Sequence, residues 1–136
     1  MTISGQLEAI ASSDDFAGST AELAQAWSVA NVGAEAIEPI LRFIEMHPEL
    51  DYGMPGPLVH FLENFYLSGY EDALIESVSR RPTALTVWML NRVLNGIREP
   101  AKRRVLLQAM RETPSHPKAD NATIERTQGF LNRLER

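Results

Sequence analysis

The sequence predicts an all-α fold in which helices follow one another in pairs. Apolar residues recur at the 3.6-residue helical period along almost the whole chain. No stretch alternates apolar and polar residues between hairpin turn pairs, so strands are not expected. Helical patterns that end in proline also return at a regular interval, which is typical of stacked helical hairpins. Together these observations predict a short array of helix pairs.

The N-terminal elements are expected over about residues 5–12 and 20–31, and a third helix begins near residue 35. The third helix has the clearest pattern, with apolar residues at i, i+3, i+4 and i+7: Ile37, Ile40, Leu41 and Ile44. Opposite them run Glu35, Glu38, Arg42, Glu45 and Glu49. Pro48 ends this helix, because proline lacks the N–H that a helix interior requires. Similar patterns predict helices over about residues 57–68, 70–80, 83–95, 99–112 and 120–135.

An internal repeat relates two of these helices. Residues 57–69 and 84–96 align with matching apolar and asparagine positions, and both segments end in glycine, at Gly69 and Gly96. Such glycines are expected at helix C-caps, where the backbone turns left-handed. A second helix ending in proline follows each segment, so that Pro48, Pro82 and Pro114 are spaced about 33 residues apart. The repeat therefore contains two helices.

The repeat predicts a right-handed solenoid of about three HEAT-like helix pairs within a single domain, residues 1–136. Residues 1–33 match the pattern loosely and are interpreted as a less regular N-terminal capping part. The repeat is imperfect around residues 97–104, which hold extra residues. An irregular helical bundle with a fortuitous repeat is therefore the alternative.

Composition limits the classes of site. The chain has no cysteine, which excludes disulfides and thiolate metal sites. No apolar run approaches the roughly 20 residues of a membrane span, and no basic segment precedes an apolar block at the N-terminus. A cytoplasmic protein without a membrane partner is expected.

Charge is distributed unevenly along the chain. Residues 1–79 hold 13 acidic residues and one basic residue, Arg42, for a net −12, whereas residues 80–136 hold 12 basic and 5 acidic residues, for +7. One interpretation is that each half has an ordinary solvated face. The other is that the acidic half attracts a basic partner, since a surface of one sign accelerates association.

Candidate chemistry centres on His60 and Glu63, which are three residues apart on a predicted helix. Such a pair can bind a metal in helical bundles, but no second pair of this kind is present, and neither is the zinc motif H-E-x-x-H. We interpret His60 as a partly buried residue bonded to a backbone carbonyl. No catalytic residue, cofactor or metal site is expected.

The basic cluster of residues 98–104, REPAKRR, raises a nucleic-acid hypothesis. No aromatic residue alternates with these bases to stack nucleobases, so a solvated helix face is preferred and no nucleic-acid partner is expected. Trp88 is interpreted as a core residue.

Tyrosines beside acidic residues suggest interface anchors, because tyrosine provides a large contact area at low entropic cost. Core packing of at least two of Tyr52, Phe65, Tyr66 and Tyr70 is the open alternative. The candidate partner-binding residues are Glu35, Glu38, Glu45, Asp51, Tyr52, Glu63, Tyr66, Tyr70, Glu71 and Asp72.

Residues 56–96 resemble small all-helical immunity proteins of bacterial contact-dependent inhibition and polymorphic-toxin systems. The likeness extends over about residues 35–112, and its most distinctive pieces are GPLVH at residues 56–60 and WMLNR at residues 88–92. The resemblance implies a protein that binds and neutralises a cognate toxin C-terminal domain, such as a basic nuclease. The alternatives are a helical-repeat scaffolding or adaptor module without a toxin partner, and an enzyme or metal protein that uses His60 and Glu63.

Overall fold

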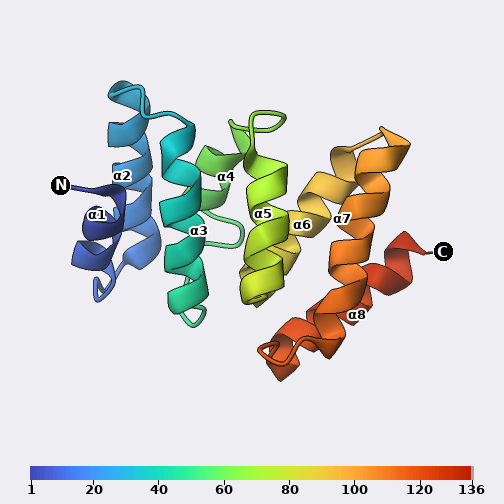
Figure 1. The fold of residues 1–136 in the computed structure, drawn as a ribbon. Coiled ribbons are helices and arrows are strands. Elements are labelled where there is room, and N and C mark those ends of the chain that lie inside the picture. The colour runs from blue at the N-terminus through green and yellow to red at the C-terminus, as the bar shows by residue number, and fades with distance from the viewer. Residues whose placement is uncertain (136) are drawn as a thin grey trace. The chain divides into compact units, whose positions relative to one another are not determined.

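The computed structural model describes residues 1–135, and these residues form eight α-helices, two 3₁₀ helices and no strand (Figure 1). The predicted all-α class is confirmed. The elements are α1 Ile3–Ile10, α2 Phe16–Val29, η1 Ala34–Ala36, α3 Ile37–Met46, α4 Pro57–Glu63, α5 Tyr70–Arg80, α6 Ala84–Gly96, α7 Pro100–Glu112, η2 Thr113–Ser115 and α8 Asn121–Leu134.

The chain divides into two compact units. Unit 1 is Met1–Tyr70 and unit 2 is Glu71–Arg136. Unit 1 carries ten acidic residues and one basic residue, a net −9, and unit 2 carries eight acidic and twelve basic residues, a net +4. The sequence predicts a single domain, built either as a solenoid or as an irregular bundle. Both descriptions refer to the arrangement of the whole chain, and they stay predictions.

Side-chain caps set the starts of the first two helices. Thr2 Oγ1 accepts a hydrogen bond from Gly5 N at 2.9 Å at the start of α1. Asp15 Oδ1 accepts one from Gly18 N at 3.0 Å, so that α2 begins at Phe16, earlier than the predicted residue 20. Each bond satisfies an N–H that the first helical turn leaves without a partner. Residues 1–33 therefore hold two capped helices.

The core of unit 1 forms where α1 packs against α2 and α3, and α2 packs against α4. The predicted apolar face of α3 is buried, since Ile40, Leu41 and Ile44 are fully enclosed. Each such side chain contributes about 1.5–3 kcal/mol by leaving water. As predicted, α3 ends before Pro48: it finishes at Met46, and His47 leaves the helical region.

Residues 51–56 form the turn that separates α3 from α4. Gly53 and Gly56 have φ values of 102° and 90°, which favour glycine. A Cβ on Gly56 would overlap the carbonyl oxygen of Tyr52, so no other residue fits this close backbone approach. Pro57 occupies the first turn of α4, as the sequence predicts.

The repeat glycines differ in conformation. Gly69 has φ 103°, in agreement with the prediction of a left-handed residue after the helix. Gly96 is the last helical residue of α6, and the left-handed cap expected there is wrong. The chain leaves α6 through Ile97 in an extended conformation, and Arg103 Nη1 donates to the carbonyl of Leu94 at 2.7 Å. This side chain satisfies a terminal carbonyl that a glycine turn would otherwise satisfy.

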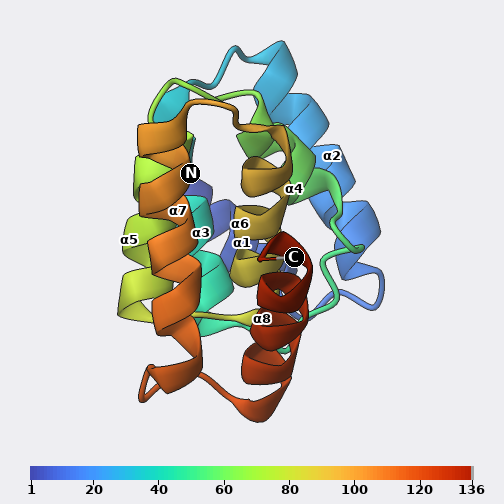
Figure 2. The same ribbon diagram turned by 90° about the vertical axis from the view of Figure 1, so that its right-hand side faces the viewer.

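In unit 2, α6 packs against α7 and α8, and α7 also contacts α8. Figures 1 and 2 show α8 beside α6. Thr83 and Thr86 form a reciprocal capping box at the start of α6. The shared core consists of Val87, Met89, Leu90, Val93, Leu94, Leu106, Met110 and Phe130.

No helix within residues 1–135 is both long enough and apolar enough to cross a bilayer.

Candidate protein-binding surface

Unit 1 presents a strongly negative surface. Its only basic residue, Arg42, is already paired, because its Nε lies 2.8 Å from Glu38 Oε1 one turn earlier on α3. Eight of the ten acidic residues of this unit are exposed: Glu8, Asp14, Asp15, Glu22, Glu35, Glu38, Glu49 and Asp51. We call these eight residues the acidic set. Exposed charges of one sign add to a field that acts over about 8–10 Å at physiological salt.

Three members of the acidic set accept hydrogen bonds from backbone N–H groups: Asp15, which caps α2, and also Glu35 and Asp51. Glu35 Oε1 accepts a hydrogen bond from Gly33 N at 3.1 Å. Hydrogen bonds from the N–H groups of Glu35 itself and of Gly33 lower the pKa of the Glu35 carboxyl, so its negative charge persists at neutral pH. Asp51 Oδ1 accepts from Gly53 N at 3.0 Å and thereby orders the turn before α4.

Glu45 is an exception among the predicted contact residues. Its expected position opposite the apolar face is wrong, because only 6% of the residue is exposed. Glu45 follows Leu41 by one helical turn, which places it along the edge of the buried stripe of α3. A buried carboxylate cannot contact a partner without a rearrangement, so Glu45 does not belong to the acidic set.

Two predicted tyrosine anchors belong to the core instead. Tyr52 is 4% exposed, meets Phe16 edge-on at a ring distance of 5.2 Å and donates through its hydroxyl to His47 O at 2.8 Å. Burial, and secondarily the carboxylates of Glu49 and Glu8, raise the pKa of Tyr52 well above its ordinary value. Tyr70 is fully buried because it begins the inward stripe that α5 continues with Leu74 and Val78.

His60 lies at the surface, and its predicted partial burial is wrong. Its side chain is 62% exposed, and Nδ1 lies 3.4 Å from Glu63 Oε1, one turn later. The inward face of α4 is formed by Leu58, Val59 and Leu62, which leaves position 60 on the outside. Within residues 1–135 no group of three potential metal ligands converges here or elsewhere.

Residues 64–69, which follow α4, expose apolar side chains. The helix ends at Glu63, earlier than predicted, and consecutive i→i−3 hydrogen bonds lead into a turn. Leu67 is 64% exposed and Tyr66 is 37% exposed. Leu67 has φ 65°, a left-handed conformation that costs about 1–2 kcal/mol for a residue with a Cβ. The sequence predicts Tyr66 as a contact residue, whereas the repeat places Leu67 among its matching apolar positions and predicts it to be buried, which is wrong.

The acidic candidates of unit 2 occur in the first turn of α5. Asp72 is exposed and Glu71 is half-buried. Carboxylates at a helix N-terminus interact favourably with its partial positive charge. This stabilising role explains why both carboxylates lie there, and no partner protein is needed to explain it.

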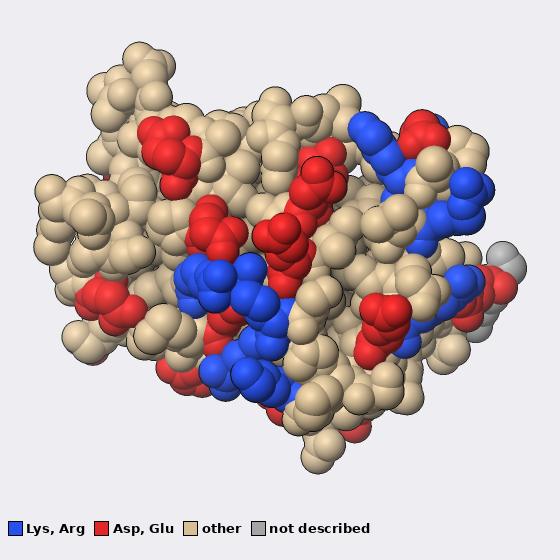
Figure 3. Space-filling view, viewed as in Figure 1, with Lys and Arg blue, Asp and Glu red and all other residues tan. Residues whose placement is uncertain are grey.

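A basic cluster surrounds the start of α7. Figure 3 shows blue side chains gathered there, and the exposed members are Arg98, Lys102 and Arg104. Glu99 accepts hydrogen bonds from Ala101 N and Lys102 N at 3.0 and 2.9 Å and caps the helix. These backbone bonds, with smaller contributions from Lys102 and Arg104, lower the pKa of Glu99. The cluster thus lies exposed at the start of a capped helix, and the expectation that it binds no nucleic acid stays a prediction.

Trp88 is only half-buried, so its assignment to the core is wrong in part. The guanidinium carbon of Arg126, on α8, lies 5.3 Å from the Trp88 ring centroid, which is within cation–π range. The α8 contact was invisible in the sequence because 38 residues separate the two partners.

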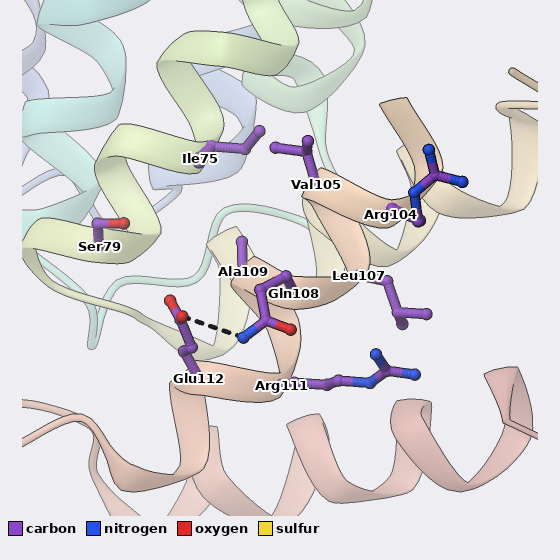
Figure 4. Close-up of a pocket in the computed structure, with 9 residues that line it drawn as sticks. All are labelled: Ile75, Ser79, Arg104, Val105, Leu107, Gln108, Ala109, Arg111 and Glu112. Atoms are coloured by element: carbon purple, nitrogen blue, oxygen red, sulfur yellow. Dashed lines mark hydrogen bonds between the residues drawn. The ribbon is translucent and has the colours of Figure 1, made fainter. Parts of the chain in front are cut away.

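An open groove runs between α5 and α7 in unit 2 (Figure 4). Ile75 and Val105 point toward one another across it, while Gln108 Nε2 donates to Glu112 Oε1 at 3.1 Å on α7. Its volume is about 590 Å³, and it is lined by Ile75, Ser79, Arg104, Val105, Leu107, Gln108, Ala109, Arg111 and Glu112. The apolar floor and polar margins are suited to a side chain of a protein partner more than to a buried small molecule.

No protein-family model, no curated protein and no solved structure matches this chain.

Proposed function

We propose that this protein is an immunity protein that binds a cognate bacterial toxin domain through the acidic set of unit 1 and neutralises the toxin. The observation that carries the proposal is the charge of this unit: it has eight exposed carboxylates and a single Lys or Arg, Arg42, which is itself paired with Glu38. The sequence resemblance adds the biological context.

A basic toxin domain is the partner of matching chemistry. Toxins that cleave nucleic acids hold phosphates with lysine and arginine, and an acidic protein surface can occupy the same groups. Long-range attraction accelerates the encounter, and close ion pairs then slow dissociation. In this proposal the protein acts by occupying a surface and carries out no chemical step.

Co-expression with the protein encoded by the neighbouring gene tests the proposal. We expect the neighbour to inhibit growth when expressed alone, and the two proteins to copurify when survival is restored. A neighbour that is harmless, or that fails to copurify, would contradict toxin neutralisation.

Charge reversal tests the surface. Glu38→Lys together with Glu49→Lys should lower the association rate constant for the toxin domain by about tenfold or more, because steering and close contacts are both lost. The loss should be larger at 50 mM than at 500 mM salt in stopped-flow measurements. Breaking the exposed Glu38–Arg42 pair should cost about 0.5 kcal/mol of folding stability or less.

The control is Glu76→Lys with Glu125→Lys, which changes the net charge equally but alters exposed residues of unit 2. It should reduce the association rate much less. Equal effects of the two double variants would show that net charge, and not the acidic set, governs association.

The groove between α5 and α7 favours an adaptor function as the second candidate, since its apolar floor is exposed at Val105. Val105→Asp should abolish adaptor binding without affecting survival in the toxin assay. The absence of a toxin gene beside this one would support the adaptor function.

A further inference from the structure

The turn that follows α4 combines two features that are unfavourable for the stability of the protein by itself. Leu67 exposes 64% of its surface although it is fully apolar, and its backbone is left-handed at φ 65°. Asparagine and glycine adopt this conformation more readily and are better suited to water. Unfavourable backbone geometry of this kind is concentrated at ligand-binding positions in proteins.

Aromatic packing supports the turn. Phe65, immediately before the exposed residues, packs edge-on against Phe61 at a ring distance of 5.5 Å. Phe61 in turn packs against Trp27 of α2 at 5.3 Å. Both Phe61 and Trp27 are buried in the core of unit 1. This row of three aromatic rings fixes the backbone from which the side chains of residues 66 and 67 project.

We propose that Tyr66 and Leu67, which we call the apolar knob, form the anchor that enters an apolar pocket of the toxin domain. The inference rests on the proposed function and names the contact that gives the complex its affinity. Buried aromatic and aliphatic anchors usually dominate interface energetics, and a preformed anchor loses little entropy on binding.

Charge determines the kind of pocket. The knob begins three residues after Glu63 and belongs to a unit of net charge −9. A complementary pocket is therefore apolar inside and bordered by lysine or arginine. The same negative charge argues against a lipid surface as the occupant, because anionic headgroups repel carboxylates.

Leu67→Asn separates binding from folding. Asparagine removes the apolar side chain and tolerates the left-handed backbone, so the melting temperature should stay unchanged or rise. The dissociation constant for a catalytically inactivated toxin domain from the neighbouring gene should increase at least tenfold by calorimetry. Tyr66→Ala should weaken binding in the same direction.

Val29→Asn serves as the matched control. Val29 lies at the end of α2 in the same unit and is 73% exposed, but it is outside the knob. Its substitution should leave the dissociation constant within about twofold of the parent value. A loss as large as that of Leu67→Asn would overturn the assignment of the anchor to the knob.

The remaining outcomes distinguish the two proposals. If the parent binds the toxin and Leu67→Asn binds equally well, the anchor is wrong and the proposed function stands. If the parent does not bind, both fail. Sedimentation with phosphatidylcholine and phosphatidylglycerol vesicles that is lost in Leu67→Asn would assign the knob to a lipid surface and overturn the inference.

Discussion

Tyr52 is held in the core of unit 1 at both ends of its side chain. Its ring packs against Phe16 and Phe43, and its hydroxyl donates to the His47 carbonyl at 2.8 Å. Burial removes the hydroxyl from water and disfavours the charged phenolate, so the neutral phenol is strongly favoured. A residue that resembles a surface anchor in the sequence thus closes the turn after α3.

This environment predicts an alkaline loss of stability. Because the pKa of Tyr52 is higher in the folded state than in the unfolded state, its contribution is complete below about pH 10 and decreases above it, as the unfolded chain ionises. Tyr52→Phe should cost about 1 kcal/mol at pH 7, by losing the hydrogen bond. The difference from the parent should shrink above pH 10 in denaturant titrations.

The exposed Tyr66 provides the comparison at this scale. Tyr66→Phe should leave the stability at pH 7 almost unchanged, because Tyr66 lies at the surface. A Tyr52→Phe curve that stayed parallel to the parent curve above pH 10 would contradict the assigned burial effect.

At the scale of the element, capping determines where helices begin, and charge placement supports them. On α5 the acids Glu71 and Asp72 occupy the first turn and Arg80 the last, which matches the helix dipole at both ends. The change from acidic to basic sequence therefore occurs along α5 and does not coincide with the boundary between units at residues 70 and 71.

The N-cap of α8 predicts acid sensitivity. Asp120 Oδ1 accepts from Thr123 N at 2.8 Å, and hydrogen bonds from the side chain and backbone of Thr123 lower the pKa of Asp120. Its contribution is complete above the unfolded pKa, near 4, and is lost as pH falls through the lower folded value. Asp120→Ala should destabilise the protein by about 1 kcal/mol at pH 7.

Asp120→Asn distinguishes capping from charge. Asparagine caps helices as well as aspartate does, so this variant should retain most of the stability at pH 7 and lose part of the pH dependence below about pH 4. If the alanine and asparagine variants were equally unstable, capping by residue 120 would not explain the effect.

Substitution by alanine is expected to have opposite effects on stability at Gly56, in the turn before α4, and at Gly96, at the end of α6. Gly56→Ala should destabilise the protein by more than about 2 kcal/mol, because its Cβ would meet the Tyr52 carbonyl and its φ is 90°. Gly96→Ala should stabilise it by about 0.5–1 kcal/mol, since Gly96 is helical and its Cβ would have open space. Chemical denaturation checks both, and destabilisation by Gly96→Ala would contradict the helical end of α6.

For the molecule as a whole, the two units differ in net charge. Unit 1 has a net charge of −9 and unit 2 a net +4, although the total is only −5. A partner approaching within about a Debye length experiences the charge of the nearer unit and not the total. Because the two units differ in charge, reversals that change the net charge equally, such as those at Glu38 and Glu76, are expected to differ in their effect on the association rate.

Local patterns in the sequence predict the presence and order of the helices and the separation of charge along the chain. Helix formation depends on neighbours three and four residues away, and prolines and caps act within a turn, so residues such as Pro48 and Pro57 could be interpreted directly. Charge adds along the chain whatever the fold. Helix positions depend on nearby residues, and net charge is a sum over residues, so neither requires knowledge of the tertiary structure.

Which side chains reach water depends on how the helices pack. Glu45 and Tyr52 resemble surface residues in the sequence but are buried, whereas His60 and Leu67 are exposed. Burial depends on which helix packs on which face, and those contacts join residues far apart in the sequence, as Trp88 and Arg126 show. The excess of acidic residues in the N-terminal half was therefore predictable from the sequence. Which of these residues are exposed, and the existence of the apolar knob, were not.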